Sequence, residues 1–471
     1  MTVNVTLVNP PYPGKAHQHP SFIPLGIAYV GAVLEKNGYS VNVIDCQAQK
    51  LNYVDLEREI GKHQPKIIGI TSTTLTYKSA LKVAAIAKQV NPYCLTILGG
   101  CHATFWDEQA LAECPQLDVI VRKEGEFTLL EIADRLKENK QITDVLGITY
   151  RKDGKVLKNP DRPLISNLDD LPFPAHHLWL DRLQKYEKLI LPVMTSRGCV
   201  FWCDFCTAVR MFGRKYRVRS PKNVVDELEF LYKTYGVTQF SFYDDAFTFS
   251  QPRTEEICQE IRSRKLKIKW NCQTRVDMVT KELLVKMRDG GCTDVWFGVE
   301  SGSQQLINAM GKGISLEQTM SAFRWAREVG LMTVGFVILG FPGETKESIW
   351  QTVELVKRIG LDDVVYHVAT PYPGTPMRDF VIKNGWLKVT DFNKYDTATP
   401  IFETPMLSMK ELRDIREKAF QKFYLSPAYV RNMLAKGGVY DYTSRTSLAP
   451  TSSRLFFAHL LRAIRSKLQS E

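Results

Sequence analysis

The sequence predicts an α/β protein with an N-terminal doubly wound parallel sheet, then a partial (βα)6 barrel and a mostly helical C-terminal region. Three observations lead to this prediction. Short apolar runs alternate with longer amphipathic runs in the first part of the chain, a second such series begins near residue 189, and the alternation stops near residue 401. With 471 residues, the chain is also too long for one ordinary core. The domains that we expect are 1–145, a hairpin and linker over 146–188, a barrel over 189–400 and a helical region over 401–471.

The first series predicts buried strands separated by helices over 24–38 and 77–90. Strands and helices in turn indicate a parallel sheet that is covered on both faces. Residues 148–159 then predict a hairpin with Asp153-Gly154 at its turn, and the proline-bearing segment 166–178 is typical of a linker. The expected strands are 3–10, 39–46, 65–73, 94–100 and 117–121.

The second series predicts six βα units, with helices such as 221–236 and 345–360 between the strands. Six units are fewer than the eight that close a complete barrel, so an open, partial barrel is expected. Ligands gather at the C-terminal strand ends of such folds. The expected strands are 189–196, 239–245, 268–274, 294–300, 333–340 and 363–370.

The composition is that of a folded protein, with 44% hydrophobic and 24% charged residues. No signal peptide or membrane-spanning run is visible, so a cytoplasmic location is expected. The net charge of +11 favours phosphate-rich partners or an anionic membrane without choosing between them. Residues 452–469 form a basic amphipathic pattern, which fits either peripheral contact with a membrane or a terminal helix packed on its own protein.

Three cysteines, Cys199, Cys203 and Cys206, fall within eight residues of the stretch TSRGCVFWCDFC (195–206). Thiolates select zinc, copper(I) or iron–sulfur clusters. A structural zinc site takes four Cys or His ligands, and the nearest upstream histidines are His176 and His177, more than twenty residues away. An electron-transfer 4Fe-4S cluster takes four cysteines, so three leave one iron open to a substrate-like molecule.

The spacing C-x3-C-x2-C, with Phe205 before the last cysteine, resembles the radical S-adenosylmethionine (SAM) superfamily. The resemblance implies that SAM chelates the open iron through its amino and carboxylate groups. It implies further that an electron from the cluster breaks the C5′–S bond, and that a 5′-deoxyadenosyl radical then abstracts hydrogen from an unreactive C–H. An electron donor such as flavodoxin or ferredoxin is the expected partner.

Later motifs follow the order of the same family. YDDAF (243–247) stands where acidic residues face the SAM amino group, and QTRVD (273–277) offers an arginine to the SAM carboxylate or ribose. FGVESG (297–302) ends a strand with a glutamate, and VGFVILGFPGET (334–345) would let the backbone approach adenine. The SAM-binding residues that the resemblance implies are Phe205, Asp244, Asp245, Arg275, Glu300, Ile338 and Gly340.

The N-terminal half resembles the cobalamin-binding domain that precedes the barrel in a large subgroup of these enzymes. The matching stretches are VNPPYP (8–13), PLGIAYVGAVLEKNGYSVNVID (24–45), ITSTT (70–74), ILGGCHAT (97–104) and RKEGE (122–126). A corrin needs small residues beneath it, which the resemblance assigns to Thr71, Ser72, Gly99 and Gly100. No aspartate stands two residues before any of the eight histidines, so the Asp-x-His-x-x-Gly motif of many cobalamin proteins is missing. His102 is a candidate cobalt ligand or a polar loop residue, and a domain that keeps the fold without the corrin is the alternative.

Together these resemblances imply C-methylation or C–C ring formation at an unactivated carbon. Family members of this build include hopanoid and antibiotic C-methylases, the anaerobic magnesium-protoporphyrin ester cyclase and archaeal tetraether-lipid ring synthases. The basic C-terminus favours a hydrophobic substrate, lipid or tetrapyrrole-like, and a role in lipid biosynthesis. One alternative is RNA modification, suggested by GRKYRVRS (213–220), although no separate RNA-binding domain is visible and no nucleic-acid partner is expected. The other is a non-enzymatic cluster or corrin sensor, for which no output module is visible.

Overall fold

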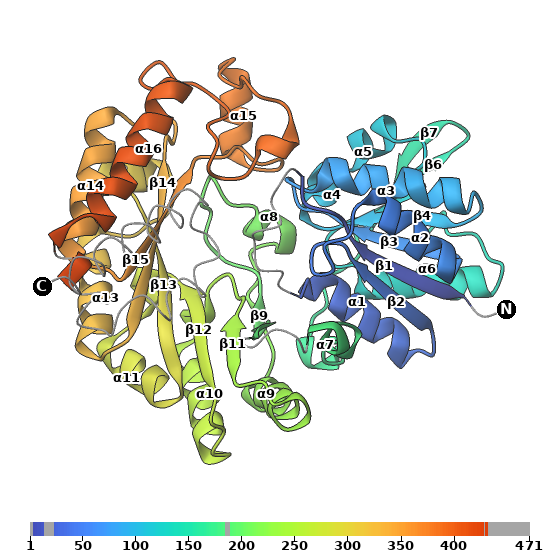
Figure 1. Ribbon diagram of the computed structural model, residues 1–471, viewed down its shortest axis with the longest axis horizontal. Coiled ribbons are helices and arrows are strands. Elements are labelled where there is room, and N and C mark those ends of the chain that lie inside the picture. Colours follow the sequence, from blue (N-terminus) through green and yellow to red (C-terminus); the bar gives the residue numbers. More distant parts are fainter. Residues whose placement is uncertain (1–2, 14–22, 184–188, 428, 432–471) are drawn as a thin grey trace, which may run out of the picture.

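The structure is a computed structural model that describes residues 3–13, 23–183, 189–427 and 429–431. The described chain forms two α/β lobes that lie side by side (Figure 1). The amphipathic stretch 452–469 lies outside the described residues.

The first lobe is built on a seven-stranded sheet in the order β2-β1-β3-β4-β5-β6-β7. β1 to β5 are parallel, whereas the hairpin of β6 and β7 pairs antiparallel with β5 and extends the same sheet. The strand order changes direction between β1 and β3, which is where ligands bind in open α/β sheets. The strands are β1 (Asn4–Asn9), β2 (Ser40–Asp45), β3 (Ile67–Thr71), β4 (Leu95–Gly99), β5 (Val119–Val121), β6 (Ile148–Lys152) and β7 (Lys155–Lys158).

Helices cover both faces of this sheet. Alternate residues of each parallel strand point to opposite faces and therefore enter different cores. Leu7 of β1 packs in the core that contains Leu34 and Leu129, while the adjacent Val8 packs in another core, with Leu56. The helical segments of this lobe and the connection after it are α1 (Leu25–Lys36), α2 (Tyr53–His63), α3 (Tyr77–Val90), α4 (Cys101–Phe105), α5 (Asp107–Glu113), α6 (Glu126–Lys137), η1 (Leu168–Asp170) and α7 (His177–Leu183).

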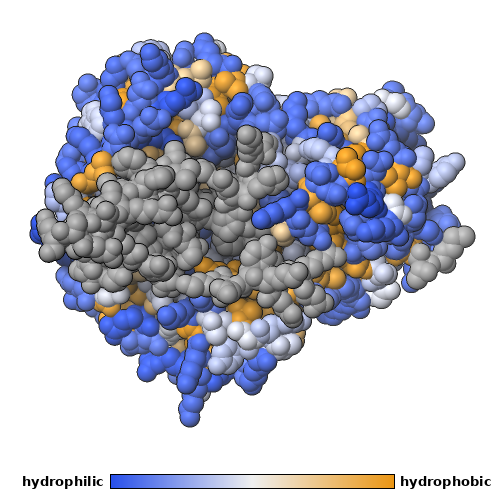
Figure 2. Space-filling view, in the orientation of Figure 1, coloured by the Kyte–Doolittle hydropathy of each residue, from blue (hydrophilic) through white to orange (hydrophobic). Residues whose placement is uncertain are grey.

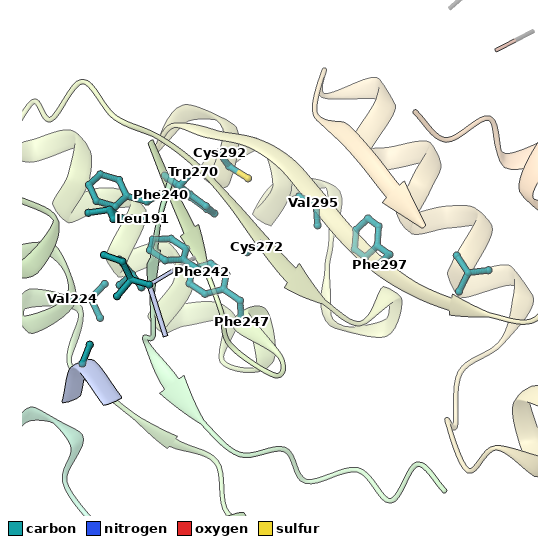
Figure 3. Packing of buried hydrophobic residues seen from close by; sticks show 14 of the residues in the cluster. Leu191, Val224, Phe240, Phe242, Phe247, Trp270, Cys272, Cys292, Val295 and Phe297 are labelled. Carbon is teal, nitrogen blue, oxygen red and sulfur yellow. The ribbon is translucent and has the colours of Figure 1, made fainter. Parts of the chain in front are cut away.

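The second lobe has six parallel strands in the order β15-β14-β13-β12-β11-β8. Its outer face packs against helices. The rings of Phe242 and Phe247 stack at 4.8 Å between centroids, beside Trp270 (Figure 3). The strands are β8 (Ile190–Val193), β11 (Gln239–Phe242), β12 (Lys269–Thr274), β13 (Cys292–Glu300), β14 (Met332–Leu339) and β15 (Asp363–Val368).

The predicted fold class is therefore confirmed: a doubly wound parallel sheet, then a partial barrel and helices toward the C-terminus. A short antiparallel pair, β9 (Ser196–Arg197) with β10 (Arg217–Val218), brackets the cysteine loop and was not predicted. The helical segments of this lobe are α8 (Ala208–Phe212), α9 (Pro221–Tyr235), η2 (Phe247–Phe249), α10 (Gln251–Ser263), η3 (Val276–Met278), α11 (Lys281–Asp289), α12 (Gln304–Ala309), α13 (Leu316–Glu328), α14 (Lys346–Ile359), α15 (Pro376–Lys383), η4 (Phe392–Lys394) and α16 (Met409–Tyr424).

The visible face is mostly hydrophilic around the residues drawn in grey, with separate hydrophobic patches (Figure 2). Among the described residues, no helix is long and apolar enough to cross a bilayer.

Candidate functional site

The three cysteines lie on a loop between β9 and α8 that neighbouring segments hold in place. Gly198 has φ +94°, and a Cβ there would collide with the carbonyl oxygen of Lys215. On the other side, the Asp204 N–H donates to the Met310 carbonyl (3.0 Å), and the Asp204 carbonyl accepts from the Met377 N–H (3.1 Å). The next residue after Met310, Gly311, has φ +66° and abuts the Trp202 carbonyl. The backbone therefore fixes this loop from both sides.

All three thiols of the loop are free, and each is half-buried or buried. Burial raises the pKa of Cys206 to about 12. It also raises the pKa of Cys203, while Lys312 and Arg275 act in the opposite direction. Within the described residues, no three His, Cys, Asp or Glu side chains converge on one ion. Three thiols on one short loop are the ligand set of an iron–sulfur cube with one open iron, in which each cysteine binds its own iron.

Beside this loop, β13 ends in a strained glutamate. The register between β13 and β14 shifts between Gly298 and Glu300, as at a β-bulge, and Glu300 has φ +61°. The Glu300 carboxylate accepts from Lys312 Nζ at 2.5 Å, and both residues are buried. Burial lowers the pKa of Lys312, but Glu300 and Cys203 more than offset this effect and the pKa is raised. A Cβ on Gly298 would collide with this pair, so the glycine leaves room for it.

Two of the predicted SAM residues are engaged in contacts inside the chain. Asp244 accepts from the Thr195 N–H (2.7 Å) and from the hydroxyls of Thr195 (2.5 Å) and Ser196 (2.6 Å). It therefore ties the end of β11 to the end of β8. Arg275 pairs with Asp277 (2.9 Å), donates to the Lys312 carbonyl (2.7 Å) and stacks on the Phe201 ring.

Asp245 is placed differently, because it lines a cavity and accepts only from the Gly198 N–H (3.2 Å) among the hydrogen bonds described. The Asp245 side chain is exposed at the cavity wall, and partial loss of surrounding water there, together with the neighbouring Asp244, raises its pKa above the ordinary value. The carboxylate thus stands between the cysteine loop and the cavity.

The remaining predicted SAM residues pack around the end of β14. Ile338 is buried, and the half-buried Phe205 packs against the same core. Gly340 has φ +82°, and a Cβ there would collide with Leu412. Its N–H donates to Glu344, a fully buried carboxyl whose Oε1 has no hydrogen-bond partner among the described residues. Burial raises the pKa of Glu344 to about 8.

A cavity of about 410 Å³ lies where the two lobes meet. Thr71, Gly99 and Gly100 line it from the first lobe, and Arg197 and Tyr243 line it from the second. A Cβ on Gly99 would meet only the Val121 carbonyl, at 3.7 Å, so the floor has room above this residue. An apolar floor built partly of glycines at a topological switch point fits a wide, flat group such as a corrin.

Two of the residues predicted to hold cobalamin do not line this cavity. The buried Ser72 hydroxyl donates to the Gly99 carbonyl (3.2 Å). His102 packs between the rings of Tyr77 (4.2 Å) and Phe392 (4.7 Å), and its Nδ1 contacts the Thr74 hydroxyl. Burial and Arg378 lower the pKa of His102 to about 3, so the imidazole is neutral.

Buried ion pairs join the two lobes beside the cavity. Glu124 accepts from Arg197 Nη1 (2.7 Å) and from Arg217 Nη1 (2.9 Å), and Glu126 accepts from Arg197 Nη2 (2.5 Å). Burial alone would lower the pKa of Arg197, but the two glutamates raise it above its usual value. Because Arg197 stands two residues before Cys199, these pairs connect the RKEGE segment to the cysteine loop.

The basic stretch 213–220, which suggested RNA modification, is not a continuous basic surface. Arg217 is buried against Glu124, and Arg219 is buried against Glu227 (2.5 Å). Arg214 and Lys215 remain exposed.

Sequence reasoning missed Lys312 and the partners of Glu124. Lys312 has a local signal, since glycines flank it on both sides in MGKG (310–313). The pairing of Glu124 with Arg197 has none, because 73 residues separate the two in the chain.

Comparisons with known proteins agree with this arrangement. Residues 193–356 match the radical SAM superfamily, and residues 16–133 match the B12 binding domain. The chain is 37% identical to an uncharacterized methyltransferase of Pyrococcus horikoshii, over 86% of this chain and 88% of the relative. It is 31% identical to the anaerobic magnesium-protoporphyrin IX monomethyl ester cyclase of Rubrivivax gelatinosus, over 92% and 80%. Its fold is similar to that of the cobalamin-dependent SAM radical enzyme OxsB with aqua-cobalamin and SAM bound. That similarity has a TM-score of 0.77 and 20% identity, and it covers 99% of this chain and 71% of that one.

Proposed function

We propose a function from one premise: the chain belongs to the radical SAM superfamily, in the group that carries an N-terminal B12-binding domain. It is an enzyme of the cobalamin-dependent radical SAM methyltransferase type, and its cofactors are a 4Fe-4S cluster, SAM and cobalamin. Within that type, we propose that it methylates an unactivated carbon of a hydrophobic small molecule.

One observation carries the proposal: a single cavity is lined both by the small residues at the strand ends of the first lobe and by residues next to the cysteine loop. A methyl group carried by a corrin and a hydrogen abstracted beside the cluster must act on the same carbon, so the two cofactors have to face one space. The shared cavity supports such an arrangement.

We assign the cofactors to residues as follows. Cys199, Cys203 and Cys206 hold the cluster, Thr71, Gly99 and Gly100 support the corrin, and His102 is left out of the corrin site because it does not line the cavity. When bound, these cofactors supply one-electron chemistry and a transferable methyl group. The residues that we propose for SAM are Phe205, Asp245, Glu300, Ile338 and Gly340, with Asp244 and Arg275 supporting them from behind.

The chain's own groups then bind, orient and exclude water. The Glu300 carboxylate can accept hydrogen bonds from an amino group, and Lys312 holds it in the inward position. Asp277 and the Lys312 carbonyl fix Arg275 beside the same loop. Apolar residues such as Ile97, Met194 and Phe212 line the cavity and keep water away from the reacting carbon.

A test that needs no substrate uses SAM with a trideuterated methyl group. The anaerobically reconstituted chain, supplied with cob(I)alamin, is expected to form trideuterated methylcobalamin, measured by mass spectrometry. With reductant, it is also expected to release 5′-deoxyadenosine. If 5′-deoxyadenosine forms but no label reaches cobalamin, ring closure replaces methylation. If neither product forms, the enzyme proposal is wrong and the sensor is favoured.

We further propose a lipid or tetrapyrrole-like substrate, an electron-transfer protein as partner and peripheral contact with a membrane through 452–469. The apolar lining of the cavity supports the first point. Deletion of 452–469 should release the protein from anionic vesicles and lower turnover of a membrane-borne substrate. If the full chain does not bind vesicles and the deletion leaves activity unchanged, the membrane contact is wrong.

A further inference from the structure

The outer side of the cysteine loop carries an exposed indole. Trp202, between Cys199 and Cys203, is 48% exposed, although tryptophan is usually well buried. The Arg210 guanidinium lies 4.9 Å from the centroid of its ring, and that of Arg214 lies 5.9 Å away. We name Trp202, Arg210, Arg214 and the exposed Lys215 the Trp202 surface.

Both arginines also contact the backbone of the cysteine loop. Arg210 Nη1 donates to the Cys206 carbonyl (2.9 Å), and Arg214 Nε donates to the Val200 carbonyl (3.3 Å). Arg214 and Lys215 are exposed, while Arg210 and the one acid of this loop, Asp204, are both half-buried, so three basic groups stand against one acid and the net charge is positive. The Trp202 ring, with two guanidinium groups beside it, is thus exposed next to the proposed cluster ligands.

We propose that the Trp202 surface docks a small acidic flavoprotein of the flavodoxin type that reduces the cluster. The inference rests on the proposed function, because it requires the cluster. In the step itself, the anionic flavin hydroquinone gives up one electron and becomes the neutral semiquinone. The cluster takes up that electron, its net charge falls by one, and no proton moves.

Charge and shape both favour this partner. Positive groups around the entry point attract an acidic protein and speed its encounter, an effect that salt screens. Tryptophan and arginine are the residues that most often carry the binding energy of an interface. The flat, apolar indole also matches the exposed edge of a flavin ring. Since Trp202 is bonded to Cys203, a carrier docked there is next to a cluster ligand.

A nucleic acid is a less suitable partner for this surface. Binding of a single strand uses an extended basic groove with several stacking aromatics. Here Arg217 and Arg219 of the same basic stretch are buried in ion pairs with Glu124 and Glu227. The basic residues of this stretch that remain exposed, Arg214 and Lys215, form a compact patch and not an extended groove.

The test measures how fast a purified flavodoxin, in its hydroquinone form, reduces the cluster of the full-length reconstituted protein in a stopped-flow instrument. Trp202→Ser and Arg214→Gln should each lower the second-order rate constant about fivefold, and added salt should lower the wild-type rate as well. Reduction by dithionite, which needs no docking, should be unchanged. Iron content and the EPR signal of each variant confirm that the cluster is intact.

Tyr93→Ser and Arg58→Gln are matched controls, since both side chains are exposed and lie on the first lobe. They should react like the wild type. The inference alone fails if the Trp202 and Arg214 variants keep the wild-type rate with flavodoxin. It also fails if only a ferredoxin reduces the cluster, or if single-stranded RNA displaces flavodoxin from this surface. A wild-type chain that binds no cluster iron overturns the proposed function as well.

Discussion

The carboxyl ends of the two parallel sheets lie on either side of one cavity, but they differ in chemistry. In the first sheet, β3 and β4 end in small residues, Thr71, Gly99 and Gly100, which leave space, whereas the buried Glu124 and Glu126 follow β5. The second sheet ends in buried charges, in which Glu300 pairs with Lys312 and Arg275 pairs with Asp277. The carboxyl ends of parallel strands therefore form an open floor of small residues in one lobe and an edge of buried charges, the charged edge, in the other.

The difference is consistent with the groups that we propose for the two edges. A wide, apolar group needs volume and contributes its own surface, so the protein needs only to avoid filling the space. A small ligand with charged ends needs charges of opposite sign, and buried charges are stable only if they have partners before the ligand arrives. Glu124, which accepts from Arg197 and Arg217, joins the two edges.

The largest effect is expected from removing the proposed cluster ligands, which lie beside the charged edge. Replacement of Cys199, Cys203 and Cys206 by alanine should abolish cluster iron, because no ligand remains. Since the floor of the first lobe is untouched, binding of cobalamin should persist. Iron analysis and the corrin absorbance measure the two separately. The control is Cys101→Ser, on the cavity side of the first lobe, which should keep its iron. A cluster retained in the triple variant would contradict the assignment.

The converse change fills the open floor. Gly99→Trp should lower the affinity for cobalamin by about a hundredfold, because a bulky side chain would occupy the space that the corrin needs. Gly99→Ala is the control, since its Cβ meets only one atom within 4 Å, at 3.7 Å, and it should bind nearly normally. Equilibrium titration with cobalamin gives both affinities, and iron content should be unchanged in both variants. Normal binding by Gly99→Trp would place the corrin elsewhere.

The third change removes one member of the buried pair at the charged edge. Lys312→Met leaves the Glu300 carboxylate buried without its cation, which should cost about 3 kcal/mol in the free energy of unfolding. The double variant with Glu300→Gln should recover most of this loss, because no buried charge then remains unpaired. Urea unfolding of the two single variants and the double variant measures the coupling. Additive losses would mean that the pair does not interact as the 2.5 Å contact indicates.

The two edges also differ in how well the sequence predicts them. The small residues of the first lobe and the three cysteines stand next to each other in short motifs, so their grouping is visible in the chain. The apolar and amphipathic runs likewise predict the alternation of strands and helices correctly, because every buried strand has to supply apolar side chains to the core. The contacts Glu124–Arg197 and Asp244–Thr195 depend on how strands far apart in sequence come together, and a single sequence carries no such information.

Direction is a second property that sequence does not give. Asp244 and Asp245 are neighbours, yet one is buried in contacts with Thr195 and Ser196 while the other lines the cavity, because successive residues of an extended segment point to opposite sides. Cys101 and His102 also face different sides, here because successive residues of helix α4 are rotated by about 100° around its axis: the cysteine lines the cavity, and the histidine ring packs against Phe392.

The smallest effect concerns the buried carboxyl behind the charged edge. The pKa of Glu344 is raised by burial to about 8, from an ordinary value of 4.5, so the native state holds a proton that the unfolded chain releases. The stability from this proton is complete below about pH 4.5 and is lost as the pH rises to about 8. Between pH 6 and pH 8, the wild type should therefore lose about 2 kcal/mol more than Glu344→Gln, whose amide does not titrate.

Urea unfolding of both proteins at pH 6 and pH 8 measures this difference, since other titrating groups contribute equally to both and cancel. Glu411→Gln is the control, because that exposed carboxyl has a pKa lowered to about 2 by its hydrogen bond with Lys346 and is ionised at both pH values. Its loss between pH 6 and pH 8 should match that of the wild type. If Glu344→Gln loses as much stability as the wild type, Glu344 is ionised in the folded protein. In that case a cation must lie near Oε1, which has no hydrogen-bond partner among the described residues, and the charged edge extends behind Gly340 as a further charged pair.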